Sequence, residues 1–537
     1  MNTKALRQKI LDLAIRGKLV PQDPNDEPAE VLLERIRRQK QQMLKEGKLK
    51  KKDIKNDTII FKGEDNLHYE KFQDGTVKCI EDEIPFEVPE GWSWVRVRDI
   101  AMVKGGKRLP KGASFSEEIT THAYIRVTDM KNHSVNISNL RYISDEIFSE
   151  IKNYTIAKDD LYVTIAGTIG VVGEIPDKLD GMNLTENAVK ITNIAINKSF
   201  LCIILQTDFV QQQFQDKTHQ VAMPKLALER ILSTLIPICS SVQQLQIVDR
   251  FQICDNFLST IDAEKEELQK IVSLSKSKIL DLAIRGKLVP QDPNDEPASV
   301  LLERIRAEKE ELIKQGKIKR DKKEAVIFKD DDNSYYEKIG DEIRCIDEEL
   351  PFEIPDRWEW VRLENCCCKE IRRGKSPKYI EQSETLVFAQ KCNTKYNGID
   401  IGLAFYLDES TLNKYPEDEY MQDGDIVINS TGTGTLGRVG FYRATDNYKS
   451  LPIVPDSHVT VIRSSRELHA FYLYAFMKAN QSELEKKGEG STNQKELKPL
   501  TLKELYIPVP PYEEQLRIAV SINNAFSLIS KLEKSLK

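Results

Sequence analysis

The chain has 537 residues, of which 40% are hydrophobic and 31% are charged, and its formal net charge is −6. This length and composition are typical of a folded protein with at least two domains and sizeable cores. The acidic balance excludes a uniformly basic nucleic-acid coat, so any nucleic-acid surface must be local.

Two helices are predicted at the N-terminus. The first ends before Gly17 and Pro21, and its apolar residues recur at helical spacing: Leu6, Ile10, Leu13 and Ala14. The second opens with Pro28 at its first position and ends near Gly47, with one apolar side: Val31, Leu32, Ile36 and Met43.

This stretch occurs twice. Lys9–Arg37 and Lys278–Arg306 differ only at Glu30, which is Ser299 in the second copy. Near-identity over such a length marks an internal duplication, and a period of half the chain is far too long for a solenoid repeat. The chain is therefore two homologous halves.

A short linker and a hairpin follow the helices. Residues 48–57 carry a basic run that we interpret as a solvated linker, with a phosphate-contacting arm as the alternative. Asp74-Gly75 predicts the turn of a hairpin over residues 68–80.

Two further blocks match between the halves, and the segments between them do not. The matched pairs are Ile84–Val97 with Leu350–Leu363, and Leu235–Val248 with Tyr506–Ala519; the diverged interiors are Ile100–Leu226 and Glu364–Leu497. Matched frames around different interiors indicate one scaffold that presents two different readers.

Short β-like runs alternate with polar turns from Trp92 to Ile165, and Phe200–Phe214 is a helix candidate, so the first variable domain is predicted to be α+β. The two Trp pairs, Trp92/Trp94 and Trp358/Trp360, are common to both halves. A shared feature cannot distinguish two targets, so we expect them to serve packing.

A long helix is predicted over Val242–Arg285, where no Pro or Gly intervenes. At about 1.5 Å per residue it would be roughly 65 Å long. Its apolar residues fall mostly at steps of three and four: Leu245, Val248, Phe251, Cys254, Leu258, Ile261, Leu268, Ile271, Leu274 and Ile279. Such a helix needs a partner helix.

The partner is predicted to be built from both ends of the chain. The C-terminal helix, Glu513–Lys537, followed by Lys4–Arg16, reproduces the central helix to within a few residues. We therefore expect the termini to meet in a split, antiparallel copy of that helix. This pairing would set the variable domains at opposite ends, related by a pseudo-twofold axis.

Two motifs imitate catalytic signatures. Val509-Pro510-Pro511-Tyr512 is similar to an amino-methyltransferase motif, but Val509 offers no acceptor for a target amine. Residues 432–437 satisfy GxGxxG, yet the sequel is β-like where the fingerprint requires a helix. We interpret these as a lead into a helix and a tight turn, with a cofactor loop as the alternative for the second.

The sequence offers no other catalytic constellation. It has no P-loop, no CxxC pair and no metal-ligand spacing. The nine cysteines, among them adjacent Cys366–Cys368, are predicted to be buried or half-buried free thiols. No run of about 18 apolar residues and no signal peptide is present, so no membrane association and a cytoplasmic location are expected.

The duplicated stretch, the PFEVPEGW block, IRVTDM, DLYVTIAGTIG and IPVPPYEEQLRIA together resemble the DNA-specificity subunit of a type I restriction–modification system. The resemblance covers essentially the whole chain. It implies two target-recognition domains that read a split, asymmetric DNA site. It also implies two methyltransferase subunits on the conserved helices and restriction–translocase subunits outside them, with S-adenosylmethionine, ATP and Mg in those partners and no cofactor or catalysis in this chain.

On this interpretation the fold is α+β, with two variable target-recognition domains separated by a long antiparallel pair of conserved helices. The expected segments are the N-terminal helices at 1–47, a linker and hairpin at 48–83, the first recognition domain at 84–236, central helices at 237–306, a second linker and hairpin at 307–349, the second recognition domain at 350–508 and a C-terminal helix at 509–537.

Contact with double-stranded DNA requires Arg and Lys on phosphates and polar side chains on base edges. A basic loop occurs at corresponding places in both halves: Lys104, Lys107, Arg108 and Lys111, and Arg372, Arg373, Lys375 and Lys378. Candidate base readers lie in or after β-like runs: Arg126, Thr128 and Asp129, and Gln390, Lys391 and Asn393. The alternative function is a two-headed scaffold that binds protein or another ligand, with the helices as a spacer.

Overall fold

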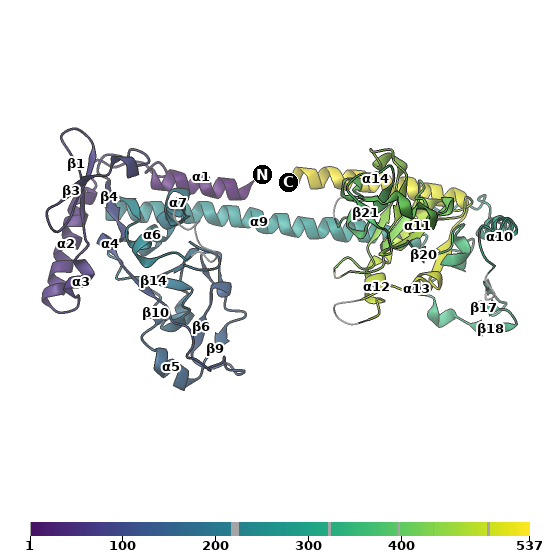
Figure 1. The fold of residues 1–537 in the computed structure, drawn as a ribbon, viewed down its shortest axis with the longest axis horizontal. Coiled ribbons are helices and arrows are strands. Elements are labelled where there is room, and N and C mark those ends of the chain that lie inside the picture. The colour runs from purple at the N-terminus through teal and green to yellow at the C-terminus, as the bar shows by residue number, and fades with distance from the viewer. Residues whose placement is uncertain are drawn as a thin grey trace. The chain divides into compact units, whose positions relative to one another are not determined.

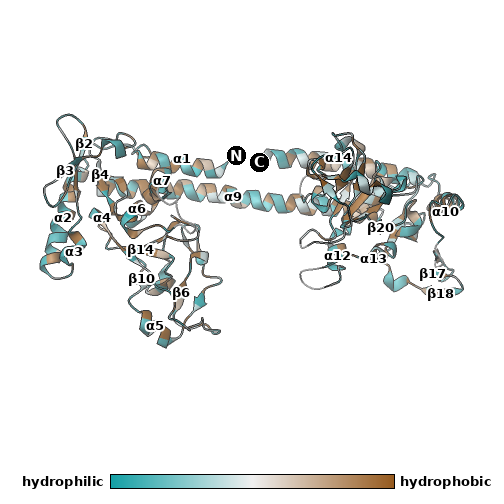
Figure 2. Cartoon of the chain, viewed as in Figure 1, coloured by the Kyte–Doolittle hydropathy of each residue, from teal (hydrophilic) through white to brown (hydrophobic). Residues whose placement is uncertain are grey.

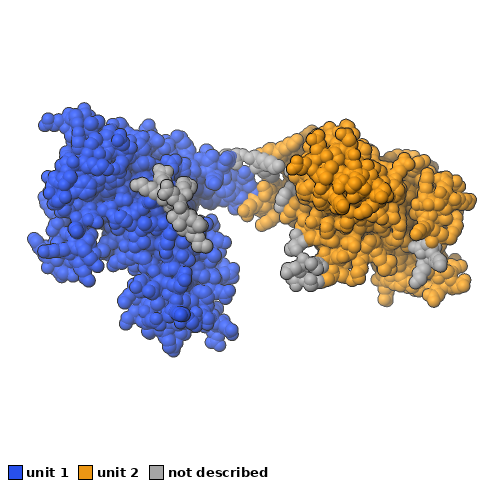
Figure 3. Space-filling view, in the orientation of Figure 1, with its two compact units in different colours: residues 1–265 blue, residues 266–537 orange. Residues whose placement is uncertain are grey.

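The computed structural model describes residues 2–215, 225–320, 324–395, 398–432, 434–490 and 495–536 (Figure 1). The chain forms two compact units, residues 1–265 and 266–537 (Figure 3). Each unit contains one copy of the duplicated stretch and one variable domain. The long helix α9 (Ser241–Ile284) contributes residues to both units and agrees with the predicted Val242–Arg285.

In unit 1, helix α1 (Thr3–Ile15) lies antiparallel along the first part of α9 (Figure 1). The Thr3 hydroxyl donates to Asp262 at 2.6 Å, and Arg7 Nε donates to Asp255 at 2.5 Å. Because the earlier residue of α1 meets the later residue of α9, the two helices run in opposite directions.

In unit 2, helix α14 (Tyr512–Leu536) lies along the last part of α9 in the same manner. Lys276 Nζ donates to Glu533 at 2.8 Å, and Leu280 shares a buried cluster with Ile518 and Ile522. The predicted antiparallel pairing is thus confirmed within each unit. That the chain termini meet concerns both units and stays a prediction.

The predicted apolar stripe of α9 is wrong in part. The helix buries Ile247, Leu258, Val272 and Leu280, whereas Leu245, Leu268, Ile271 and Leu274 are exposed. Figure 2 shows hydrophobic and hydrophilic residues mixed along α9. Steps of three and four describe more than one stripe, and only contact with α1 and α14 decides which one is covered.

The duplicated stretch continues into helix α2 (Ala29–Lys45) in unit 1 and α10 (Ala298–Lys314) in unit 2. Pro28 stands just before α2 rather than at its first position. Gly17 has a φ of +63°, and a Cβ there would lie 2.7 Å from Pro89 Cγ, so only glycine fits this turn.

A three-stranded antiparallel sheet follows in each unit. In unit 1 it comprises β1 (Ile59–Lys62), β2 (His68–Lys71) and β3 (Val77–Cys79), and in unit 2 β16 (Ala325–Lys329), β17 (Tyr335–Ile339) and β18 (Glu342–Cys345). The hairpin predicted around Asp74-Gly75 is confirmed as β2 and β3. Strand β1 was not predicted.

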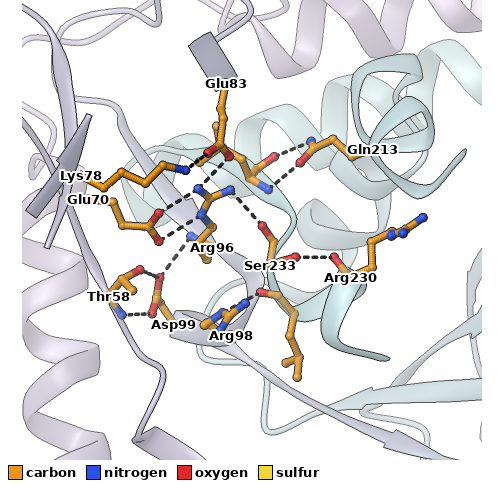
Figure 4. A network of polar contacts seen from close by, with 12 residues as sticks. Thr58, Glu70, Lys78, Glu83, Arg96, Arg98, Asp99, Gln213, Arg230 and Ser233 are labelled. Carbon is orange, nitrogen blue, oxygen red and sulfur yellow. Dashed lines mark hydrogen bonds and ion pairs between the residues drawn. The ribbon is translucent and has the colours of Figure 1, made fainter. Parts of the chain in front are cut away.

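An arginine of the neighbouring matched block binds a buried glutamate in each of these sheets. Arg96 Nη2 lies 2.9 Å from Glu70 in β2 and 2.8 Å from Glu83, and its Nη1 donates to the carbonyl of Ser233 at 3.0 Å (Figure 4). Burial raises the pKa of Glu70, but the bonds from Arg96 outweigh it and hold that pKa below its usual value. In unit 2, Arg362 binds Glu337 in the same way, at 2.7 Å.

The second and third matched blocks of the sequence pair with each other. Strand β4 (Ser93–Arg96) is antiparallel to β15 (Leu235–Ile238), and β19 (Glu359–Arg362) is antiparallel to β28 (Tyr506–Val509). The matched blocks therefore close a frame around each variable domain. The four Trp residues are buried in this frame, which confirms their packing role.

Each variable domain contains two four-stranded sheets. In unit 1 the first has the order β12 (Val172–Glu174), β11 (Leu161–Thr164), β14 (Ala188–Thr192), β5 (Met102–Gly105), and the second β10 (Thr155–Ile156), β13 (Met182–Leu184), β6 (Ala123–Ile125), β9 (Arg141–Tyr142). The pair of β13 and β6 is parallel.

Unit 2 repeats this topology. Its first sheet has the order β25 (Val439–Phe441), β24 (Ile426–Asn429), β27 (Val459–Ile462), β20 (Arg372–Arg373), and its second β26 (Ile453–Pro455), β22 (Leu386–Phe388), β23 (Phe405–Leu407), β21 (Tyr379–Ile380). Only the edge strand differs, since β10 lies beside β13 but β21 lies beside β23. The diverged interiors thus share one fold.

The single helix predicted over Phe200–Phe214 is two helices, α6 (Lys198–Leu205) and α7 (Asp208–Gln215). The break falls at Thr207, whose hydroxyl bonds the carbonyl of Ile204 and competes with the helix. Their counterparts in unit 2 are α11 (Ala470–Ala479) and α12 (Gln481–Lys486).

The cysteine prediction holds for seven of the nine residues, which are buried or intermediate, and fails for the exposed Cys79 and Cys345. All nine are free thiols. Within the part of the chain that the structure describes, no helix is both long and apolar enough to cross a membrane.

Candidate nucleic-acid interface

The variable domain of unit 1 carries an open hollow of about 380 Å³. It lies where the loop after β5, the turn after β6 and the turn after β13 meet. Its lining comprises Arg108, Leu109, Phe115, Tyr124, Arg126, Val127, Thr128, Thr185, Glu186 and Asn187. Three predicted site residues, Arg108, Arg126 and Thr128, are thereby brought together from distant parts of the sequence.

The basic loop of unit 1 is fixed by its backbone and leaves its side chains exposed. The N–H of Lys107 donates to the carbonyl of Leu184 at 2.9 Å, and its own carbonyl accepts from Tyr124 Oη at 2.7 Å. Lys104, Lys107 and Lys111 are exposed and form no salt bridge with any residue that the structure describes. These three ammonium groups are available to phosphates.

Arg108 is held over the hollow by Glu186. Its Nε lies 2.7 Å from the Glu186 carboxylate, while the Arg108 side chain remains 79% exposed. Burial raises the pKa of Glu186, but hydrogen bonds from Arg108 and others outweigh it and lower that pKa overall. A paired guanidinium with free donors at the mouth of a hollow can bind a base edge or a phosphate.

Arg126 and Asp129 are bound to each other. Arg126 donates from Nε and Nη2 to the two carboxylate oxygens at 3.0 and 2.7 Å, and Asp129 is only 4% exposed. The structure therefore places Asp129 inside the domain, where it orients Arg126. Thr128, between them in sequence, lines the hollow.

The equivalent arginines of unit 2 are engaged by acidic side chains. In β20, Arg372 lies 2.6 Å from Glu419 and Arg373 lies 2.9 Å from Glu496. Lys375 and Lys378 follow; Lys378 is exposed, and neither forms a salt bridge with a described residue. The two basic loops thus occupy equivalent places but differ in how much of their charge is already paired.

The remaining candidates of unit 2 lie after β22. Asn393 is 1% exposed, and its amide donates to Asn429 and to the carbonyl of Arg438. It is therefore inside the domain and does not face a groove. Lys391 lies 3.4 Å from the centre of the Phe405 ring, and Gln390 borders the glycine turn at Gly432.

A glycine at the same place in both loops fixes the geometry of the interface. A Cβ on Gly106 would lie 2.1 Å from the carbonyl oxygen of Thr185, and one on Gly374 would lie 2.2 Å from that of Pro455. Each basic loop thus crosses in direct contact with the end of a strand of the second sheet, β13 or β26, and with the turn that follows that strand. No larger residue permits this approach.

The turns that these glycines contact were not among the residues predicted for the site. Thr185–Asn187 lines the hollow of unit 1, and Asp456–His458 stands at the equivalent place in unit 2. Each turn is a short polar interruption directly before a strand-like run. That signal was present in the sequence, but it is common to many surface turns and so did not stand out.

The two motifs that resemble catalytic signatures have the predicted structural roles. Residues 432–437 form a turn with Gly432, Gly434 and Gly437 at positive φ, and strand β25 follows instead of a helix; Thr433 lies outside the described residues. Val509 ends β28, and Tyr512 begins α14. No cluster of three His, Cys, Asp or Glu side chains among the described residues is placed to hold a metal ion.

A family model described as the type I restriction modification DNA specificity domain matches residues 89–271 and again residues 355–537. The EcoEI specificity subunit of a type I restriction enzyme from Escherichia coli is 26% identical over 99% of this chain and 91% of its own length. The EcoAI specificity subunit, also from Escherichia coli, is 30% identical over 67% of this chain and 62% of its own length.

Solved structures give weaker likenesses. The HsdS subunit from Thermoanaerobacter tengcongensis matches over 85% of this chain and 94% of its own, with 17% identity and a TM-score of 0.38. A structure described as the basis of complex assembly and conformational transition of the type I R-M system covers 84% of this chain and 94% of its own, with 16% identity and a TM-score of 0.48.

Proposed function

The chain belongs to the type I restriction–modification DNA specificity family, and we propose that it reads a bipartite, asymmetric DNA site, one half-site with each variable domain. It is a specificity subunit and not itself an enzyme. We further propose that it positions methyltransferase subunits for adenine methylation, and restriction–translocase subunits, on that site.

One observation carries this proposal. Two domains of the same topology present a basic loop and a neighbouring polar turn at the same place, while the side chains at that place differ between them. A common scaffold with different side chains supports two domains that bind the same kind of ligand. Each domain would then recognise a different base sequence. The exposed basic residues suit the phosphate backbone of duplex DNA, which carries much of the affinity without sequence information.

The same comparison supports two identical protein partners per chain. The outer face of each three-stranded sheet carries the same series of residues: Ile59, Phe61, Tyr69, Lys71, Val77 and Cys79 in unit 1, and Val326, Phe328, Tyr336, Lys338, Ile343 and Cys345 in unit 2. Neighbouring strands place each set on one face. Since the reading domains diverged and this face did not, it suits a partner that is used twice.

In this proposal the cofactors belong to the partners. S-adenosylmethionine would be bound by the methyltransferase subunits, and ATP and Mg by the restriction–translocase subunits. Purified alone, the chain should transfer no labelled methyl group, cleave no DNA and hydrolyse no ATP. Methyl transfer by the isolated chain would contradict its assignment to a non-catalytic role.

The central experiment is a genome-wide map of methylated adenines in cells with and without this gene. We expect methylation at two unlike half-sites separated by an unread gap. In parallel, the complex with its methyltransferase should bind duplex DNA with a steep dependence on salt, because phosphate neutralisation releases counterions. Salt-independent binding to a protein or small ligand would instead favour the two-headed scaffold.

Stoichiometry is tested separately. Native mass spectrometry at saturating methyltransferase should give two copies per chain, as expected for two near-equivalent docking surfaces. Substitution of Phe61 or Phe328 by Asp should each remove one copy if the sheet faces are part of those surfaces. A single methyltransferase at saturation would contradict the proposal.

A further inference from the structure

We propose that the two turns after β13 and β26 read bases, Thr185–Asn187 in the first half-site and Asp456–His458 in the second. This inference rests on the proposed function and goes further, since it assigns the discrimination between the half-sites to particular side chains. It is carried by a comparison of the two turns, which have the same backbone contacts and different side chains.

The backbone of each turn is held by equivalent bonds. The N–H of Asn187 donates to Thr185 Oγ1 at 3.5 Å, and the N–H of His458 donates to Asp456 Oδ1 at 2.7 Å. The carbonyl of Asn187 accepts from the N–H of Ile165 at 2.8 Å, and that of His458 accepts from the N–H of Ser430 at 2.8 Å. The first residue of each turn therefore serves the fold.

The residue that follows each turn, at the start of β14 or β27, binds the basic loop. The N–H of Gly106 donates to the carbonyl of Ala188 at 3.1 Å, and that of Gly374 donates to the carbonyl of Val459 at 3.0 Å. With the glycine contacts described above, these bonds fix each turn directly beside exposed cationic side chains. A side chain on the turn thus has a set position relative to groups that would hold the DNA backbone.

The second and third residues of each turn are free to differ, and they do. Unit 1 has Glu186 and Asn187, and unit 2 has Ser457 and His458. None of these four side chains makes the hydrogen bonds that hold the backbone of its turn. Each turn keeps the same main-chain geometry while its polar side chains differ. Such a change can alter which base is read without altering the fold.

The side chains of the unit 1 turn match base edges. Asn187 is half-buried, lines the hollow, and its amide makes no hydrogen bond to any described residue. An asparagine amide donates and accepts at once, which suits the N6 and N7 edge of adenine in the major groove. Beside it, Arg108 keeps donors free that suit the O6 and N7 edge of guanine, while Glu186 holds its Nε.

The side chains of the unit 2 turn offer different chemistry. His458 is exposed, and its Nδ1 lies 2.7 Å from the hydroxyl of Thr431. Its ring therefore has a fixed orientation that leaves Nε2 for a ligand. A hydroxyl from Ser457 and an imidazole nitrogen cannot form the paired contact that an asparagine amide forms, so the second half-site should differ at the corresponding base.

The test uses the complete complex of this chain with its methyltransferase and a pool of duplexes randomised over both half-sites. For Asn187→Ala, we expect one base position of the first half-site to lose roughly ten- to hundredfold discrimination, as the loss of one bidentate contact implies. The second half-site should be unchanged. For His458→Ala, only the second half-site should change.

Two further variants separate reading from folding. Asn187 holds the turn through its N–H and carbonyl, so alanine retains those bonds, and Gln212→Ala on α7 removes an exposed amide that does not line the hollow. Replacement of Thr185, Glu186 and Asn187 by Asp, Ser and His transfers the whole unit 2 turn into unit 1. It should select a new first half-site rather than none.

The outcomes distinguish this inference from the proposed function. If the unmodified complex selects no bipartite site, the proposed function is wrong. If it selects one, and Asn187→Ala and the transferred turn both select the same first half-site as the unmodified complex, these turns do not read bases and only this inference is wrong.

Discussion

The anchor of the three-stranded sheet differs between the two units in its redundancy. In unit 1, Arg96 is the one arginine among the described residues that forms a salt bridge with Glu70. In unit 2, Glu337 is bound by Arg362 at 2.7 Å and also by Arg344 at 2.8 Å. Both glutamates are buried. Both units thus keep the same ion pair between an arginine and the buried glutamate of the sheet. The number of arginines that bind this glutamate differs between the units.

The largest expected effect follows from this difference. Arg96→Ala leaves Glu70 buried without a cation and should destabilise the sheet of unit 1 by about 3–5 kcal/mol, the usual cost of breaking a buried ion pair. Arg362→Ala should cost less, because Arg344 still binds Glu337. Hydrogen exchange of the amides of residues 68–71 and 335–339 measures both. Equal losses in the two variants would mean that Arg344 contributes nothing to the anchor.

A second difference lies beside the anchor and concerns charge. Asp99 accepts hydrogen bonds from the N–H groups of Thr58 and Arg96, and burial raises its pKa to about 7. The equivalent residue in unit 2 is Asn365, whose amide donates to the carbonyl of Ala325 at 2.8 Å. One unit thus titrates at this position and the other does not.

This difference predicts a pH dependence confined to unit 1. Because the folded pKa of Asp99 lies above the ordinary aspartate value, its contribution to stability is fully present at low pH and is lost as pH rises from about 4 to about 7. Asp99→Asn removes the titrating group and should therefore flatten this decline. Asn365→Asp should introduce the decline into unit 2. Local hydrogen exchange at several pH values checks both, and an unchanged profile for Asp99→Asn would refute the assignment.

The basic loops allow a comparison through DNA binding. In unit 1, Lys107 has no salt bridge with a described residue, whereas Arg372 and Arg373 are engaged by Glu419 and Glu496. Charge reversal at Lys107 and Arg108 should weaken binding and lower the salt slope by about one per lost phosphate contact. Reversal at Arg372 and Arg373 should change the slope less. If neither double variant changes the slope, the loops face solvent in the complex.

The smallest expected effect on the variable domains themselves comes from lengthening helix α9. Four residues inserted near Ala263 lengthen α9 by about 6 Å at about 1.5 Å per residue. We expect both half-sites to be retained and the preferred gap to grow by about one or two base pairs, each about 3.4 Å. A methylation map checks this. Altered half-sites with an unchanged gap would show that the helices do not set the spacing.

The sequence predicted the frame well because the duplication supplied an internal comparison. The two copies of the helical stretch and the Trp pairs lie in matched blocks, whereas the hairpin at Asp74-Gly75 was predicted from its turn residues alone. The split into α6 and α7 was missed because Thr207 ends the first helix by a local hydrogen bond that periodicity does not register. The exposed side of α9 was misassigned because the covering helices are far away in sequence.

The candidate site was predictable by residue type and not by contact. Arg108, Arg126 and Thr128, predicted as DNA-contact residues, line one hollow, but Glu186, which binds Arg108, lies 78 residues from it in the sequence. Asn393 was expected to face a groove and is instead hydrogen-bonded inside its domain. Strand register decides which polar side chain points outward, and one sequence does not reveal that register.

The closed frame around each variable domain has an evolutionary consequence. The frame contacts its domain through features present in both copies, such as the bond of Gln244 to the N–H of Asn197 and of Gln515 to the N–H of His469. A domain moved from one frame to the other would meet the same attachment points. If the variable domains read DNA as proposed, exchange of gene segments between the near-identical stretches would change the recognised half-site in one step without altering the frame.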